Sequence, residues 1–298
     1  MAVAAARSVV RMVSPTKAGP LFRLIGSVDI KGKGTKHELE GLDPVVLCDF
    51  AVINGAGNPP FGLHPHYGLI AVTTVFEGGF NDGDNLNPPD GHVNPAGGIY
   101  MVSAGRGVCH QESTAFDGRT VAVQTIFKIP DDKKDFLPEL IKVSPEDIPL
   151  LDAPAGCVVK LTVGKLGDVE SPAKVKSLPR VVMLMVKAEG KATMELPLDE
   201  DLEHGFVYVV SGKCRIGNQD NWYEAGKELL IFGGGADLKI ESGEEGLEAL
   251  VVAGKPLNEP WFKLLGNNGF IIASTEEEAE KVMNVIQQTG KEFSFKKL

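Results

Sequence analysis

The chain has 298 residues, of which 43% are hydrophobic and 23% are charged, and its formal net charge is −10. This length and composition are typical of a globular protein of about two domains. The acidic balance argues against direct binding to nucleic acid, because that binding needs Lys and Arg to neutralise phosphates. No stretch approaches the roughly 18 uninterrupted apolar residues of a membrane-spanning helix, so we expect no membrane association.

The residues before Asp29 include basic side chains and no acidic ones. They are compatible with a transit peptide, but residues 8–13 alternate in a way that favours a β-strand, and we expect the strand. The four cysteines lack CxxC spacing, which indicates reduced thiols rather than disulfides. No signal peptide or long basic nuclear-localisation run stands out, so we expect a cytoplasmic protein, with the nucleus as the alternative.

Short runs rich in β-branched residues recur between turn signals, at 69–76, 120–127, 157–163, 180–186, 205–210, 229–232 and 247–252. This pattern predicts an all-β protein, either a sandwich or a barrel. One helix is expected from Thr275 to Gly290, since Thr275 and Glu278 have the spacing of a capping box. Its apolar stripe is expected to dock against a barrel, and consists of Ala279, Val282, Met283 and Ile286.

A weak internal repeat links the two halves of the chain. Val75-Phe-Glu-Gly78 resembles Val209-Val-Ser-Gly212, and in each copy an Ala-Gly pair, at 96–97 or 225–226, opens a later strand. The repeat predicts two similar β-barrels in tandem. We place them at residues 1–140 and 155–260, with a C-terminal segment, 261–298, whose helix packs back on the barrels.

Two i, i+2 pairs of metal-ligating residue types stand on predicted strands: His64-Pro-His66 and His110-Gln-Glu112. Residues i and i+2 of a strand point to the same face, so each pair can aim two side chains at one point. Facing each other inside a barrel, the pairs would form a pocket of three histidines and one carboxylate. That ligand set suits Fe, Mn, Ni, Cu or Zn, with Fe(II) the natural candidate where coordination positions stay open. The alternative is four unrelated polar residues.

Counting from the repeat glycines places other residue types at the second-copy positions of these ligands, namely Leu198, Glu200, Lys239 and Glu241. We therefore expect metal only in the first barrel. Cys109 should face away from His110 as a buried, inert thiol. His37 and His92 lie in polar, Gly- and Pro-rich surroundings and are expected at the surface. Gly105-Arg106-Gly107 predicts a tight turn in which Arg106 meets an anionic substrate group or faces solvent.

The chain at this point resembles the pirin family, whose fold is a bicupin. Leu63-His-Pro-His-Tyr-Gly68 is similar to the family's HPHRG, and residues 101–112 are similar to its WMTAGRGIxHSE. Segments 42–49 and 254–260 extend the resemblance over nearly the whole chain. The resemblance implies two tandem cupin barrels with a few short helices, the first carrying metal and the second lacking ligands.

By this resemblance, His64, His66, His110 and Glu112 fall on the family's four metal ligands, usually for iron. Four neighbours depart from the family pattern: Tyr67 stands for Arg, Ile70 for Glu, Tyr100 for Trp and Ser103 for Thr. These departures leave the ligand set intact but change the surroundings of the site. We expect Tyr67 and Arg106 to contact the substrate of an enzyme.

The resemblance implies three alternative functions. The first is a quercetin 2,3-dioxygenase-type oxidoreductase, in which one metal ion binds a flavonol, Glu112 acts as the catalytic base, and reaction with O₂ releases carbon monoxide. The second is a non-enzymatic, iron-dependent transcription coregulator that binds transcription factors or other proteins, which the acidic charge fits. The third is a degenerate cupin with a structural metal or none. We expect a monomer.

Overall fold

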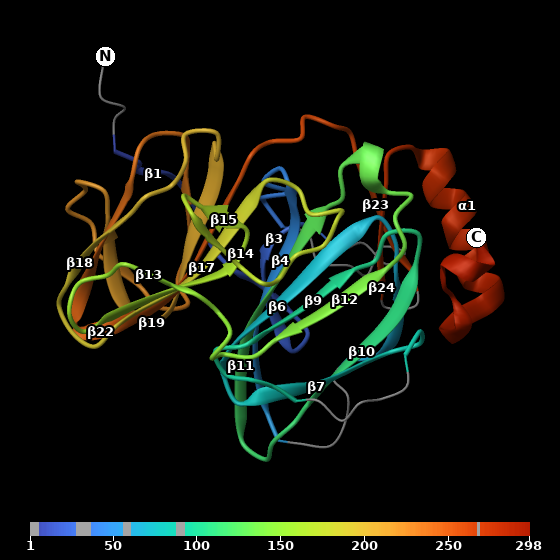
Figure 1. The fold of residues 1–298 in the computed structure, drawn as a ribbon, viewed down its shortest axis with the longest axis horizontal. Helices are drawn as coiled ribbons and strands as arrows, with labels where there is room; N and C mark the ends of the chain where they lie inside the picture. The colour runs from blue at the N-terminus through green and yellow to red at the C-terminus, as the bar shows by residue number, and fades with distance from the viewer. Residues whose placement is uncertain (1–5, 28–36, 56–60, 88–92, 267–268) are drawn as a thin grey trace.

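The structure, a computed structural model, describes residues 6–27, 37–55, 61–87, 93–266 and 269–298. Two β-barrels lie side by side, and the helix α1 (Glu276–Thr289) lies on the outer side of the first barrel, away from the second (Figure 1). The predicted all-β fold of two tandem barrels with a C-terminal helix is confirmed. No helix within these ranges is long and apolar enough to cross a membrane.

The first barrel is built from two antiparallel sheets. Its strands are β2 (Thr16–Ala18), β3 (Leu21–Ile25), β4 (Val45–Asn54), β5 (Phe61–His66), β6 (Leu69–Glu77), β7 (Gly79–Asp84), β8 (Val93–Pro95), β9 (Ile99–Ser103), β10 (Val108–Thr114), β11 (Arg119–Lys128) and β12 (Glu139–Val143). The larger sheet has the order β12-β9-β6-β11-β4-β3-β2, and the smaller one the order β5-β10-β7-β8. Both predicted ligand strands, β5 and β10, are therefore neighbours in the smaller sheet.

The second barrel is formed by one large sheet. Its strands are β1 (Val9–Val13), β13 (Leu150–Leu151), β14 (Cys157–Val163), β17 (Val181–Ala188), β18 (Thr193–Leu196), β19 (His204–Ile216), β20 (Tyr223–Glu224), β21 (Leu229–Phe232) and β22 (Leu238–Gly254). Their order is β1-β21-β19-β22-β17-β14-β13, with β18 joined to β22 and β20 to β19. The predicted N-terminal strand is confirmed as β1, and it pairs with β21 of the second barrel.

Two hairpins and three short 3₁₀ helices complete the fold. They are β15 (Lys165–Leu166) with β16 (Val169–Glu170), β23 (Phe262–Gly266) with β24 (Gly269–Ala273), η1 (Asp131–Lys133), η2 (Gly290–Glu292) and η3 (Phe295–Lys297). The β23–β24 hairpin leads directly into α1, and both lie against the first barrel (Figure 1).

The predicted C-terminal helix is confirmed with its cap. The Thr275 hydroxyl accepts a hydrogen bond from the Glu278 backbone N–H at 3.1 Å, and Gly290 ends the helix with a φ of +55°. Ala279, Val282 and Ile286 are buried. The apolar stripe thus docks on the rest of the protein, as its 3.6-residue period predicts.

The internal repeat is visible in backbone hydrogen bonds. The Ala96 N–H donates to the Gly78 carbonyl at 3.0 Å, and the Ala225 N–H donates to the Gly212 carbonyl at 3.0 Å. Both glycines have a positive φ, +72° for Gly78 and +76° for Gly212, which glycine adopts without strain. The two barrels therefore share this turn in atomic detail.

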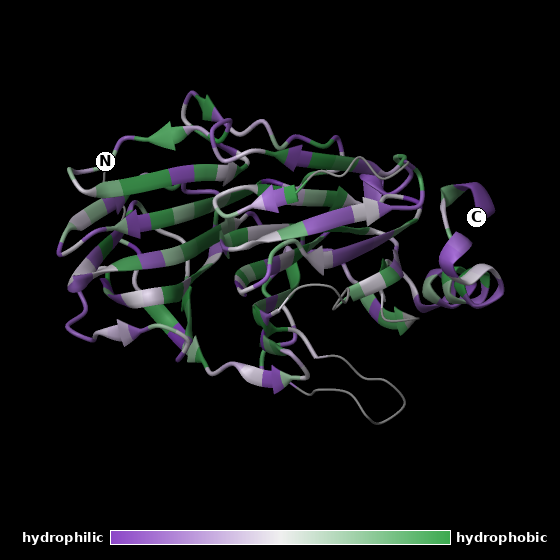
Figure 2. Ribbon diagram, turned by 90° about the horizontal axis from the view of Figure 1, so that it is seen from below, coloured by the Kyte–Doolittle hydropathy of each residue, from purple (hydrophilic) through white to green (hydrophobic). Residues whose placement is uncertain are grey.

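The two barrels differ in what fills them. The second has a large apolar cluster, which includes Leu184, Val207 and Leu230. The first also buries polar side chains, among them the four predicted ligands and the pair Arg23 and Asp49. Figure 2 shows hydrophobic and hydrophilic residues alternating along many strands, the pattern of a sheet with one buried face.

Two sequence-based placements are wrong. His37 was expected at the surface, but only 5% of it is exposed, and its Nδ1 accepts a hydrogen bond from the Leu39 N–H at 3.1 Å. Counting from the repeat glycines equated Lys239 with His110, yet Lys239 pairs with Glu195, and neither side chain is buried. The count forward from Gly226 therefore does not keep the register of β22. His92 lies outside the described residues.

Candidate metal centre

The ligand strands β5 and β10 run antiparallel and bring the predicted histidines together. His110 pairs directly with His64, and a β-bulge follows between His110 and Glu112. His64, His66, His110 and Glu112 are all buried, at 7%, 1%, 1% and 2% exposure. The i, i+2 spacing therefore points all four side chains away from solvent, as the alternation of a strand requires.

The three histidines form a compact triangle. Their ring centroids lie 4.8 Å apart for His64 and His66, 4.5 Å for His64 and His110, and 4.7 Å for His66 and His110. One nitrogen from each ring lies within 4.8 Å of the other two, so the group could hold a metal ion. Nε2 of His66 and Nε2 of His110 are 2.9 Å apart.

Backbone carbonyls orient two of the rings. Nδ1 of His64 is 2.7 Å from the Gly62 carbonyl oxygen, and Nδ1 of His66 is 3.2 Å from the Phe270 carbonyl oxygen. A histidine that donates through Nδ1 leaves the Nε2 lone pair for a metal. Sequence reasoning did not find either carbonyl, since a backbone oxygen has no residue-type signal and Phe270 is 204 positions from His66.

The histidines are held in the neutral form that binds metals. Burial, together with the neighbouring His64, lowers the pKa of His66 to about 3. Burial also lowers the pKa of His64, and it lowers that of His110 well below the usual value, with His64 and His66 adding to the effect. A cluster of neutral imidazoles presents lone pairs rather than positive charge to the space between the rings.

The arrangement fits a bound cation. Two nitrogens that each lie about 2.1 Å from one ion at a right angle are about 3.0 Å apart, close to the separation of the two Nε2 atoms. Nδ1 of His110 is buried and has no hydrogen-bond partner among the described residues. A buried polar atom without a partner is costly. A metal on Nε2 of His110 would leave Nδ1 protonated and free to meet a water molecule.

Glu112 faces a small space that none of the three histidines lines. Its carboxylate accepts a hydrogen bond from the Thr73 hydroxyl at 2.6 Å and another from the Gln124 amide at 2.9 Å. It lines a cavity of about 20 Å³ that also touches Asp49, enough for about one water molecule. Burial raises the pKa of Glu112, while these two hydrogen bonds act to lower it. Its part as fourth ligand stays a prediction.

The two residues predicted to contact substrate have other neighbours here. The Tyr67 hydroxyl donates to Glu278 of α1 at 2.7 Å, and burial with the nearby Glu278 raises the pKa of Tyr67. Arg106 is exposed in the predicted turn, where its N–H donates to the Phe136 carbonyl at 3.2 Å. The substrate contacts of Tyr67 and Arg106 stay predictions.

The other departures from the family pattern lie in the barrel wall. Ile70 is fully buried in the main apolar cluster, and Tyr100 is buried with its ring centroid 6.1 Å from that of His110. The Ser103 hydroxyl forms a 2.5 Å hydrogen bond with Ser177, in the segment that joins β16 to β17. Of these three residues, Tyr100 is the one whose ring lies near a histidine of the triangle.

Cys109 behaves as predicted. It is fully buried on the opposite side of β10 from the ligands, in an apolar cluster with Val282, Ile286 and Phe293. Burial raises the pKa of its thiol to about 12, so the reactive thiolate is scarce at neutral pH.

Comparison with protein families shows to which family the chain is related. Residues 33–126 match the Pirin family, and residues 183–290 match the Pirin C-terminal cupin domain. The chain belongs to the pirin family. Its two barrels are the two cupin domains of a pirin, in agreement with the resemblance seen in the ligand motifs.

Among relatives, human pirin is 25% identical over 251 residues, covering 84% of this chain and 83% of that protein. A Pseudomonas aeruginosa protein, named provisionally as a quercetin 2,3-dioxygenase, is 28% identical over 232 residues. The match covers 75% of this chain and 77% of that protein. Among solved structures, quercetin 2,3-dioxygenase from Acinetobacter baumannii has a TM-score of 0.78 at 22% identity, covering 98% and 100%. A bacterial pirin from Escherichia coli in complex with nickel(II) has a TM-score of 0.59 at 19% identity, covering 83% and 99%.

Proposed function

We propose that this pirin is a mononuclear metal protein whose ion is held by His64, His66 and His110, with Glu112 as the fourth ligand. The observation that carries the proposal is the buried triangle of neutral histidines, with two Nε2 atoms 2.9 Å apart. In the structure Glu112 is engaged by Thr73 and Gln124. Each carboxylate oxygen keeps a second lone pair, but the group of converging ligand atoms does not include Glu112, so ligation requires its carboxylate to move toward the histidine nitrogens.

We propose iron as the metal. Imidazole and carboxylate are borderline to hard ligands and the group contains no thiolate, so iron, nickel, copper, manganese and zinc all suit it by chemistry. The nickel(II) complex of the Escherichia coli pirin supports a divalent transition metal in this fold. Only metal analysis of the protein decides between these ions.

For activity, we propose a quercetin 2,3-dioxygenase-type reaction, in which a flavonol and O₂ give a ring-opened ester and carbon monoxide. A metal bound here would supply Lewis-acid activation of the flavonol oxygens. Glu112 would take the proton of the flavonol hydroxyl. Burial raises the pKa of Glu112, which makes its carboxylate a stronger base. The Thr73 hydroxyl would keep the carboxylate oriented.

A second candidate is a non-enzymatic, metal-dependent regulator that binds other proteins. It is favoured by the size of the space at Glu112: about 20 Å³ in the described part of the chain, against a few hundred Å³ or more for typical small-molecule sites. A flavonol would need the barrel mouth to open wider than this. The net charge of −10 suits contact with basic protein surfaces.

The first test is elemental analysis of the purified protein beside the His64→Ala/His110→Ala double variant. A matched control is His204→Ala, because His204 is a histidine outside the triangle whose Nδ1 lies 2.8 Å from the Asp43 carbonyl oxygen. We expect about one equivalent of iron in the wild type and in the control, and none in the double variant. Absence of any transition metal in the wild type, even after anaerobic loading with Fe(II), would reject the metal site.

The second test separates the enzyme from the regulator. Oxygen uptake and carbon monoxide release are measured with quercetin, in wild type and in Glu112→Gln, each loaded with metal. We expect turnover only in the wild type. Full turnover in Glu112→Gln with metal retained would remove Glu112 as the base. A metal-loaded wild type without turnover would leave the regulator as the function, to be pursued by comparing partner binding with and without metal.

A further inference from the structure

The C-terminal hairpin reaches back to the histidine triangle. Strand β24 follows β5 by about 200 residues, yet it lies beside the end of β5, where Ile271 forms a parallel bridge with Tyr67. The Ile272 N–H donates to the Tyr67 carbonyl at 2.9 Å. Two residues before Ile272, the Phe270 carbonyl oxygen lies 3.2 Å from Nδ1 of His66. A strand distant in sequence thus supplies a direct contact to a candidate ligand.

Two glycines make this approach possible. A Cβ at Gly269 would lie 1.8 Å from the carbonyl oxygen of Pro65, the residue between the two histidines of β5. A Cβ at Gly68 would lie 2.0 Å from the carbonyl oxygen of Ile272. Real Cβ atoms do not approach backbone oxygens so closely, and the obstacle in both cases is backbone that cannot rotate away. Glycine on each side therefore fixes how close β24 lies to the His64-Pro65-His66 strand.

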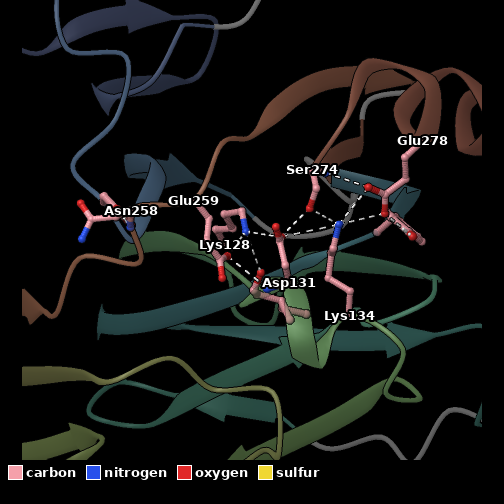
Figure 3. Close-up of polar contacts among 10 residues, drawn as sticks. Lys128, Asp131, Lys134, Asn258, Glu259, Ser274 and Glu278 are labelled. Atoms are coloured by element: carbon pink, nitrogen blue, oxygen red, sulfur yellow. Dashed lines mark hydrogen bonds and ion pairs between the residues drawn. The ribbon is translucent and has the colours of Figure 1, made fainter.

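A polar network fastens the same segment to the first barrel (Figure 3). Lys134 donates to both carboxylate oxygens of Glu278, at 2.8 and 3.0 Å, and to the Ser274 hydroxyl. The Ser274 hydroxyl in turn donates to Asp131, and the Tyr67 hydroxyl donates to Glu278. Ser274 and Glu278 directly follow β24 in the chain, so this network holds β24 from its C-terminal side.

The other end of the segment is fastened in the same way. Lys128 is 1% exposed at its side chain and forms ion pairs with Asp131, at 2.5 Å, and with Glu259 (Figure 3). Glu259 precedes the β23–β24 hairpin. The hairpin is thus held both before and after the point where it touches His66, which limits how far the Phe270 carbonyl can move from the ring.

We propose that β24 is a positioning element of the metal centre: the Phe270 carbonyl holds His66 as the Nδ1–H tautomer, and Gly269 sets the distance at which it does so. This inference rests on the proposed function, because it concerns a metal held by the three histidines. The Phe270 N–H also lies 3.4 Å from Nδ1 of His66, but the carbonyl contact is the shorter one. Only the Nδ1–H tautomer directs the Nε2 lone pair toward the other histidines. Partners of this kind typically change metal affinity 10–100-fold.

The primary test is Gly269→Ala in the full chain, with Gly190→Ala as the matched control. The control makes the same chemical change in the second barrel, where the nearest atom to the new Cβ is 3.7 Å away. The tautomer of His66 is read in the metal-free protein from its ring nitrogen shifts by long-range ¹H–¹⁵N NMR. Affinity for Co(II) is measured by chelator competition, and its geometry from the visible absorption bands.

We expect His66 to be the Nδ1–H tautomer in the wild type and in Gly190→Ala. In Gly269→Ala we expect a mixture of tautomers, a Kd for Co(II) raised by about 10–100-fold and altered Co(II) bands. A purely structural role for Gly269 would lower the melting temperature without changing the tautomer.

A second variant covers the case in which Gly269→Ala does not fold. Glu278→Gln with Lys134→Met releases the network after β24 without touching β5 or its histidines, and Glu278→Asp with Lys134→Arg should restore it. We expect a loss of Co(II) affinity of a few-fold, in the same direction, and its recovery in the conservative pair. The inference is overturned if His66 is the Nε2–H tautomer in the wild type, or if every folded variant keeps the wild-type tautomer. A wild type that binds no metal would reject the proposed function alone, since the tautomer is read without metal.

Discussion

The buried ion pair of Arg23 and Asp49 offers a sharp test of how the first barrel tolerates charge. Arg23 donates from Nε and, at 2.9 Å, from Nη2 to the two carboxylate oxygens of Asp49, and the side chains are only 4% and 5% exposed. Arg23 Nη1 also donates to the Gly26 carbonyl at 3.1 Å. Asp49 lines the same small cavity as Glu112. Without Arg23, Lys263 would be left as the nearby cation for Asp49, whose carboxylate shares that cavity with the carboxylate of Glu112.

We therefore predict that Arg23→Met lowers the free energy of unfolding by about 3–5 kcal/mol, the usual cost of leaving one partner of a buried pair uncompensated. For a barrel of this size that corresponds to a fall in melting temperature of roughly 6–20 °C. The matched control is Arg119→Met in the same barrel, because Arg119 and Glu77 form a pair whose side chains are 51% and 48% exposed. The control should cost no more than about 1 kcal/mol.

The pH dependence of the stability lost in Arg23→Met is the second test of this reasoning. Burial raises the pKa of Asp49 even with Arg23 in place, so in the wild type its stabilising contribution is greatest at low pH and is lost as the pH rises through its folded pKa. Removing Arg23 raises that pKa further. Urea unfolding should thus show a larger loss for Arg23→Met at pH 7.5 than at pH 5. Equal losses at both pH values, or a loss no greater than in the Arg119→Met control, would refute the reasoning.

Three further outcomes are expected. Gly212→Ala should lower the melting temperature far more than Gly226→Ala. Both glycines have a positive φ, but only at Gly212 would the new Cβ meet backbone, 2.2 Å from the Gly246 carbonyl oxygen. Equal losses of melting temperature in the two variants would contradict this reasoning. Cys157, the partly exposed one of the four thiols, should be the first to react with a disulfide reagent in the native protein, as peptide mapping would show. Burial would raise the pKa of Glu278, but hydrogen bonds led by that from Lys134 lower it overall, so the stability that Glu278 contributes is lost as the pH falls through its folded pKa. The protection factors of the α1 amides, corrected for the intrinsic exchange rate at each pH, should then fall below about pH 4.

Much of the fold could be predicted because its signals are local. β-branched runs between glycines gave the strands, and the Thr275 cap with the stop at Gly290 gave the helix. The Gly78 and Gly212 turns could be matched because a positive φ selects glycine in both copies. The equivalence of Lys239 and His110 failed because a count along the chain cannot detect a difference in loop length before a strand, and a shift of one residue moves a side chain to the other face.

The histidines of the site could be predicted for the same reason: His64 and His66 follow the two-residue period of a strand, as do His110 and Glu112. Their surroundings could not. Thr73 and Gln124 meet Glu112 from β6 and β11, and Phe270 meets His66 through its backbone. Neither sequence spacing nor residue type predicts such contacts, because the contacts form only when strands distant in sequence pack together. His37 was misplaced likewise, as its burial depends on packing rather than on its polar neighbours.

The two barrels differ in the side chains that they bury, and this difference helps to explain why the first barrel contains buried polar groups. The second barrel shows that the same fold can be filled with apolar side chains such as Leu184, Val207 and Leu230. The first instead buries three neutral histidines and the carboxylate of Glu112, each of which is harder to remove from water than a leucine. The fold does not require these groups. The convergence of the three histidines on one point, with His66 oriented by a strand from the far end of the chain, is therefore best explained by a ligand that the barrel holds there, and a transition-metal ion fits their ring nitrogens.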